Sequence, residues 1–200
     1  MSIRHIMLAA ALALAHFQAT AQTTVAGVRF EPEAAVAGQR LQLNGAGVRF
    51  KLFIKVYAAA LYTSRKAVRT EDVLQPDMAK RMHLVALRDT GGDELGKLFS
   101  RAIEDNASRE EFAKSIADVV RMGQIFADAH ELRKGEVITV DYAPGTGLVI
   151  GFRGRQQGEA FKSPQFSSLM FKIWFGPKPP DGPLQGALLG AQTTANSNVN

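Results

Sequence analysis

The sequence has no cysteine among its 200 residues, and histidine is scarce as well. The missing cysteine excludes disulfide bonds, thiolate catalysis and cysteine-ligated metals. Beyond residue 21 the histidines are His83 and His130, which lie in separate segments without HxxxH or HxH spacing and without clustered carboxylates. We therefore expect neither a metal nor any other cofactor.

The chain also lacks the usual motifs of nucleophilic catalysis and phosphate binding. No GxSxG sequence is present, and Ser167-Ser168 falls within a predicted helix. The Gly45-Ala46-Gly47 triplet has no third glycine and precedes a predicted strand, which is not the order of a phosphate loop. The sequence therefore indicates neither a serine hydrolase nor a nucleotide-binding protein.

One apolar run has the length and flanks of a targeting segment. Residues 6–15 follow Arg4 and His5 and precede Ala19-Thr20-Ala21, a small-x-small cleavage site. This pattern predicts a secretory signal peptide over residues 1–21, because the run is too short for a membrane span. Export without disulfides fits a bacterial periplasm better than a eukaryotic extracellular space, and no membrane anchor is expected after cleavage.

Positive charge is only slightly in excess, and it is scattered along the chain. Removal of residues 1–21 would leave 23 basic against 19 acidic side chains, a net charge of +4. The basic residues form no single run with interleaved aromatics, so a nucleic-acid partner is not expected.

The remaining length is sufficient for one domain, predicted over residues 22–190, and the final residues 191–200 are predicted to be disordered. Alternating apolar residues predict an antiparallel sheet, and apolar residues at helical spacing predict helices on one of its faces, which is an α+β fold. The predicted strands cover residues 28–31, 39–43, 48–62, 80–88, 136–142 and 147–153.

Capping residues and glycines mark the ends of the predicted helices. Asp93 is placed to cap the first long helix, and residues 108–111, Ser-Arg-Glu-Glu, have the form of a capping box for the second. Gly123 is expected to interrupt this second helix. Ser163-Pro164 predicts the start of the last long helix, and Gly176-Pro177 predicts its end.

The segment from Asn44 to Thr63 organises the predicted sheet. Its even-numbered positions from 48 to 62 are all apolar or aromatic, the period-2 pattern of a buried sheet face. The odd-numbered positions begin charged and become apolar, as expected of a cleft wall or of a sheet half in water. The pattern is long for one strand, so a bend or tight hairpin is predicted near residues 51–53. Residues 44–47 are predicted to form a turn.

Arg49 and Tyr57 are the polar side chains of this segment with the clearest functional potential. Their even separation places both on one face of a regular strand, and a hairpin between them would bring them together on neighbouring strands. Arginine supplies a bidentate charged fork and tyrosine a neutral donor, a pair that suits an anionic oxygen. The alternative is a surface arginine and a tyrosine at the edge of the core.

The run GAGVRFKLFIKVYAAALYT resembles the signature of the chalcone isomerase-like family. It has the Gly-x-Gly-x-Arg start, the apolar strand with lysine and the Leu-Tyr ending, and the order of the other elements agrees over residues 25–176. The resemblance implies an open-faced β-sandwich, in which an antiparallel sheet and a helix layer enclose an apolar cleft.

The resemblance also bears on function. Plant chalcone isomerases pair an Arg with a Thr, and their first paired helix adds a Tyr, a Lys and an Asn. Arg49 matches, but Tyr57 occupies the Thr position, and an alignment on Asn106 puts Phe99 and Ala102 at the Tyr and Lys positions, which argues against chalcone cyclisation. Fatty-acid-binding proteins of the same fold hold the carboxylate with an Arg and a Tyr, as Arg49 and Tyr57 would.

We therefore expect a non-catalytic binder of a fatty acid or a similar amphipathic anion. An intramolecular lyase or isomerase acting on another substrate and an envelope structural or interaction protein are the alternatives. The sequence leaves the oligomeric state open. The expected ligand contacts are Arg49 and Tyr57 for the head group, Phe99, Ile103 and Trp174 for the tail, and Asn106 as a further contact.

Overall fold

The computed structural model describes residues 22–191, so the predicted signal peptide and residues 192–200 of the predicted tail lie outside the described residues. The strands are β1 (Thr23–Val25), β2 (Val28–Phe30), β3 (Glu33–Val36), β4 (Gln39–Lys51), β5 (Ile54–Thr63), β6 (Lys80–Ala86), β7 (Thr90–Gly91), β8 (Glu131–Leu132), β9 (Val137–Ala143), β10 (Gly147–Phe152) and β11 (Arg155–Phe161). Seven of them form one sheet in the order β11-β10-β9-β6-β5-β4-β3, with every neighbouring pair antiparallel.

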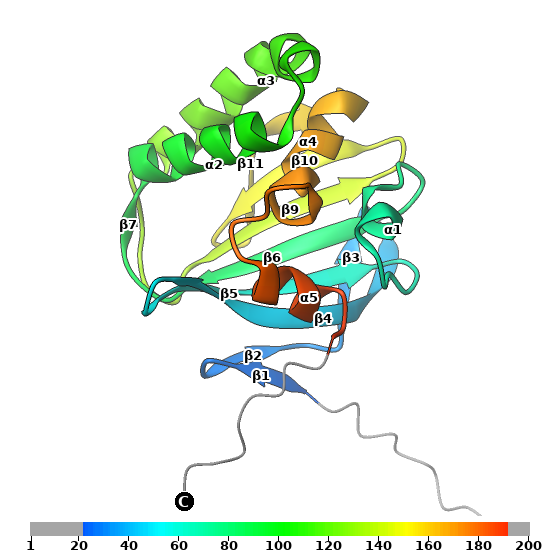
Figure 1. Cartoon of the computed structure of the whole chain (residues 1–200), viewed down its shortest axis with the longest axis vertical. Helices are drawn as coiled ribbons and strands as arrows, with labels where there is room; N and C mark the ends of the chain where they lie inside the picture. Colours follow the sequence, from blue (N-terminus) through cyan, green and yellow to red (C-terminus); the bar gives the residue numbers. More distant parts are fainter. Residues whose placement is uncertain (1–21, 192–200) are drawn as a thin grey trace, which may run out of the picture.

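The helices are α1 (Thr70–Leu74), α2 (Gly92–Asn106), α3 (Arg109–Asp128), α4 (Pro164–Phe175) and α5 (Gly182–Leu188). In Figure 1, α2, α3 and α4 lie over one face of the curled sheet, and the β1–β2 hairpin lies on the other side. The predicted α+β fold is confirmed. Among the helices of residues 22–191, none is long and apolar enough to cross a membrane.

The long alternating segment is a hairpin of two strands, as predicted. β4 and β5 are joined by the two residues Leu52 and Phe53, and a register shift follows Arg49. Beyond the turn, both faces of β5 become buried. Ala59 and Leu61 belong to the core between the sheet and the helices, whereas the even-numbered alanines of β5 pack toward the β1–β2 hairpin.

The predicted turn over residues 44–47 is wrong, because β4 runs through it without a break. Gly45 and Gly47 allow α5 to pack closely against β4. A Cβ on Gly45 would lie 2.2 Å from the carbonyl oxygen of Ala187, and one on Gly47 would lie 2.9 Å from the Ala187 Cβ. Asn44 falls at a register shift of the ladder, and its buried side chain bonds both the backbone of Ala67 and the carbonyl of Leu188.

Two expected helix boundaries also differ from the structure, and the glycines Gly92 and Gly96 allow α2 to pack closely against α3. The N-cap of α2 is Gly91 rather than Asp93, and a Cβ on Gly92 would lie 2.2 Å from the Phe126 carbonyl oxygen. α3 continues through Gly123, whose carbonyl oxygen lies only 3.3 Å from a Cβ built on Gly96.

The other helix signals are confirmed, whereas five strands of the described residues were not predicted, namely β1, β3, β7, β8 and β11. The capping box over residues 108–111 is formed, and Ser163 caps α4 with Pro164 in its first turn. α4 ends at Gly176 as predicted. β11 escaped prediction because its polar sequence, RQQGEAF, lacks a regular apolar alternation.

A buried lysine beneath α1 gives the fold a measurable pH dependence. Lys80 is 3% exposed, and its ammonium donates hydrogen bonds to the carbonyls of Val73 (2.5 Å) and Gln75 (2.9 Å). Burial lowers the pKa of Lys80 to about 8, although the charge of Asp77 acts in the opposite direction. The charged form is therefore less favourable in the folded protein than in the unfolded chain.

Stability is expected to rise with pH because of this lysine. Between its folded pKa of about 8 and the ordinary value of about 10.4, the unfolded chain binds more protons than the folded protein. The free energy of unfolding should increase by about 2 kcal/mol from about pH 7.5 to about pH 9.5. Urea unfolding at the two pH values measures the rise, and Lys80→Met should abolish it. Equal rises in the wild type and this variant would assign the effect to other groups.

Candidate functional site

A cavity of about 200 Å³ lies between the helix-facing side of the sheet and helices α2 and α4. Most of its wall is apolar, with side chains from β6, β9, α2 and α4. The exposed residues of its lining define the mouth. They are Lys51, Arg88, Glu94 and Leu98, and Arg49 and Tyr57 also line the cavity.

Arg49 and Tyr57 lie directly opposite each other on β4 and β5. The hairpin therefore places the two side chains on neighbouring strands and on the same, helix-facing side of the sheet. The Tyr57 hydroxyl accepts a hydrogen bond of 3.0 Å from the indole N–H of Trp174 on α4. This bond uses an oxygen lone pair, so the phenolic proton stays available to a ligand in the cavity.

The raised pKa keeps the phenol of Tyr57 protonated over the physiological pH range. Burial raises its pKa to about 12, and the hydrogen bond from Trp174 and the charge of Arg49 only partly oppose this rise. A tyrosine in this state cannot serve as a phenolate base near neutral pH. It can donate one oriented hydrogen bond.

Asp181 partners Arg49, and sequence reasoning missed it. The Arg49 guanidinium lies 3.9 Å from the Asp181 carboxylate, and both side chains are largely buried. That carboxylate also accepts hydrogen bonds from the backbone N–H groups of Phe50 (2.9 Å) and Leu184 (3.0 Å), the second as the N-cap of α5. The sequence Asp-Gly-Pro at residues 181–183 is a helix-start signal that could have revealed the cap. It could not have revealed the contact with Arg49.

The other expected contacts divide into two groups. Phe99 and Trp174 line the cavity and pack edge to face, with their ring centroids 5.9 Å apart. Ile103 is fully buried in the core and does not line the cavity. Asn106 turns away from it, because its amide bonds the carbonyl of Ala102 and both backbone groups of Lys178. The structure therefore brings together four of the six expected residues.

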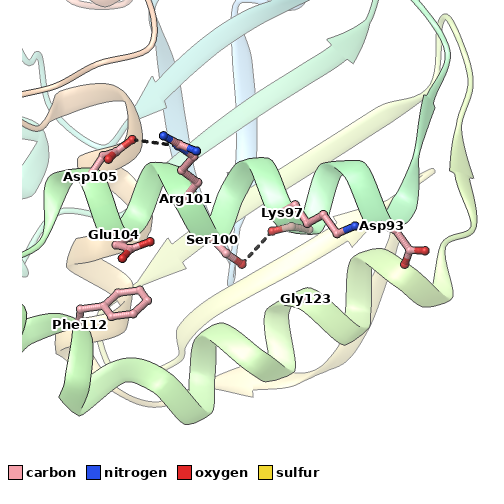
Figure 2. A pocket seen from close by; sticks show the side chains of 9 residues that line it. Asp93, Lys97, Ser100, Arg101, Glu104, Asp105, Phe112 and Gly123 are labelled. Carbon is pink, nitrogen blue, oxygen red and sulfur yellow. Dashed lines mark hydrogen bonds and ion pairs between the residues drawn. The ribbon is translucent and has the colours of Figure 1, made fainter.

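A larger and more open hollow, of about 750 Å³, lies between α2 and α3 (Figure 2). We call it the α2–α3 groove. Figure 2 shows charged side chains of both signs along the α2 side, and Arg101 forms a 3.9 Å ion pair with Asp105 there. Phe112 and Gly123 lie on the α3 side. This charged wall offers little apolar contact to the tail of an amphipathic ligand. The cavity between the sheet and helices α2 and α4 is therefore the better site for such a ligand.

Comparisons with known proteins identify the fold and the family. No curated protein matches the chain significantly. A solved structure of a fatty-acid binding protein from Arabidopsis thaliana superposes with a TM-score of 0.68 at 17% identity, over 82% of this chain and 92% of that one. This likeness confirms the open-faced arrangement of sheet and helices. A model of the chalcone isomerase-like family matches residues 22–190. The chain therefore belongs to the chalcone isomerase-like family.

Proposed function

We propose that this protein binds a fatty acid or a similar amphipathic anion in the cavity between the sheet and α2 and α4. One observation carries the proposal: an apolar cavity contains the oriented phenol of Tyr57 beside the guanidinium of Arg49. The fold is shared with a protein described as a fatty-acid binding protein, which supports the same ligand class. We also propose that the chain is exported, on the pattern of residues 1–21.

The charges around the cavity favour a carboxylate over a neutral head group. Arg49, Lys51 and Arg88 line it, against the single carboxylate of Glu94. Asp181 offsets part of the Arg49 charge, but its distance of 3.9 Å leaves the guanidinium donors free for a closer anion. A carboxylate held by Arg49 and Tyr57 would point its chain toward the apolar wall.

The size of the cavity limits the ligand. A volume of about 200 Å³ is below the roughly 300–1,000 Å³ typical of ligand pockets. We therefore expect short and medium acyl chains to fit without rearrangement. A long chain would have to displace wall side chains or leave its end in the mouth near Leu98.

The single tryptophan of the sequence makes this proposal directly testable. Trp174 lines the cavity and bonds Tyr57, so ligand binding should change its fluorescence. Titration with octanoate, dodecanoate and hexadecanoate gives the affinity and its dependence on chain length. Octanol, which has no charge, is the matched control for the head group. Equal affinity for octanoate and octanol would contradict recognition of an anion.

Removal of the Tyr57 hydroxyl should weaken binding moderately. Tyr57→Phe keeps the ring in the wall but deletes one hydrogen bond, so the affinity for octanoate should fall about threefold to tenfold. Tyr62→Phe is the matched control, because the Tyr62 hydroxyl bonds the carbonyl of Glu31 at 2.9 Å and does not line the cavity. Isothermal titration calorimetry of both variants measures the difference. If both bind like the wild type, Tyr57 is not a ligand contact.

A further inference from the structure

The tip of the β4–β5 hairpin exposes an apolar surface that the ligand cavity does not explain. Residues 50–55, Phe-Lys-Leu-Phe-Ile-Lys, are exposed without interruption, and we call them the hairpin tip. Leu52 and Phe53 are 86% and 97% exposed, and Phe50 and Ile54 are about half exposed. Folding does not require large apolar side chains at these solvent-exposed positions. Exposed apolar clusters of this kind commonly mark interaction sites.

The residue preferences of tight hairpin turns do not explain the sequence of the tip either. A two-residue hairpin turn usually has asparagine or glycine where the backbone is left-handed. Here Leu52 occupies that position with a φ of 56°, which is unfavourable for a branched apolar side chain. The sequence therefore places large apolar groups at the outermost point of the hairpin at some conformational cost.

The hairpin tip borders the mouth of the cavity. Lys51 belongs to the tip and lines the cavity, together with Arg88 and Glu94 from the segment around β7. In Figure 1 the β4–β5 turn and β7 lie at the same end of the molecule. Leu98, which also lines the mouth, adds a side chain that is 48% exposed.

We propose that the hairpin tip docks this protein onto a bilayer that contains anionic phospholipids. Leu52 and Phe53 would enter the boundary between head groups and acyl chains. Lys51 and Lys55, one on each side of the turn, would contact the phosphates. Apolar insertion combined with basic flanks is the usual chemistry of interfacial membrane binding. The docking does not depend on which ligand the cavity holds, but it would place the mouth beside a source of amphipathic ligands.

The charges of the tip disfavour a second copy of the chain as the occupant. Two tips in contact would bring four lysines together, since each contributes Lys51 and Lys55. No acidic residue lies within residues 50–55 to compensate for them. An anionic lipid surface complements both the apolar and the charged side chains of the tip.

Vesicle co-sedimentation tests the proposal. The wild type should bind vesicles of phosphatidylcholine mixed with phosphatidylglycerol more strongly than vesicles of phosphatidylcholine alone, and high salt should weaken this preference. The double variant Leu52→Ser/Phe53→Ser should lower partitioning at least about tenfold. Its thermal unfolding should stay unchanged, because both side chains are in water in the free protein. An added indole in Phe53→Trp should be quenched by brominated acyl chains.

The matched control is Ile116→Ser/Val120→Ser on α3. These apolar side chains are 49% and 67% exposed but lie away from the hairpin, so this variant should keep vesicle binding. The proposal is overturned if the wild type does not bind the vesicles, or if the two double variants lose binding equally. It is also overturned if the tip instead forms a dimer interface. Sedimentation velocity would then show a wild-type dimer that Leu52→Ser/Phe53→Ser converts to a monomer.

Discussion

Replacing Arg49 with methionine is expected to lower the affinity for octanoate about 10- to 100-fold, because a charge-assisted hydrogen bond contributes about 1.5–3 kcal/mol. The arginine lines the cavity beside Tyr57, and methionine keeps most of its apolar stem. The affinity for octanol should change little, since that ligand has no charge to lose. Titration of Trp174 fluorescence with both ligands measures the two effects in one variant.

Arg101→Met is the control for removal of one positive charge. Its side chain is 82% exposed and lines the α2–α3 groove rather than the cavity. We expect no change in octanoate binding in this variant. If Arg101→Met weakens binding as much as Arg49→Met does, the ligand occupies the groove and the proposed site is wrong.

A change of opposite sign is expected at Asp181. Asp181→Asn removes the carboxylate that lies 3.9 Å from Arg49, and an asparagine can still cap α5. With less competition for the guanidinium, octanoate should bind several times more tightly. Weaker binding in Asp181→Asn would show that the carboxylate positions Arg49 rather than competes for it.

Gly45→Ala is expected to destabilise the folded protein by about 3 kcal/mol. The added Cβ would meet backbone atoms of α5, the carbonyl oxygens of Ala187 at 2.2 Å and Leu188 at 2.6 Å. Backbone atoms of a helix cannot rotate away as a side chain can, so α5 must move off the sheet. The movement would also disturb the bond between the Asn44 amide and the Leu188 carbonyl.

Gly123→Ala is the matched control for this substitution. A Cβ at Gly123 meets nothing within 4 Å and lies in the interior of α3. Alanine is the better helix former, so this variant should gain about 0.5–1 kcal/mol in the free energy of unfolding. Urea unfolding compares the two. Equal stabilities of Gly45→Ala and Gly123→Ala would mean that α5 is not held tightly against β4.

The sequence by itself determined many local features of the fold and four of the residues that line the candidate site. The length of the period-2 pattern predicted a bend or hairpin near residues 51–53, and a hairpin puts Arg49 and Tyr57 on neighbouring strands. The register shift after Arg49, which the sequence did not reveal, is what pairs the two residues on one face. The capping box at Ser108 and the Ser163 cap could be predicted because donor and acceptor lie three residues apart.

Only the tertiary structure decided which glycines were turns and which were packing contacts. Gly45 was expected in a turn, but it faces α5, and the Asn44 amide beside it bonds a residue 144 positions away. Asp181 reaches Arg49 over a similar distance in sequence. The orientation of Asn106 toward Lys178 rather than the cavity has the same origin. Contacts between distant segments depend on how the sheet and the helices pack. The local sequence pattern of one segment therefore cannot predict which residue of the other segment it contacts.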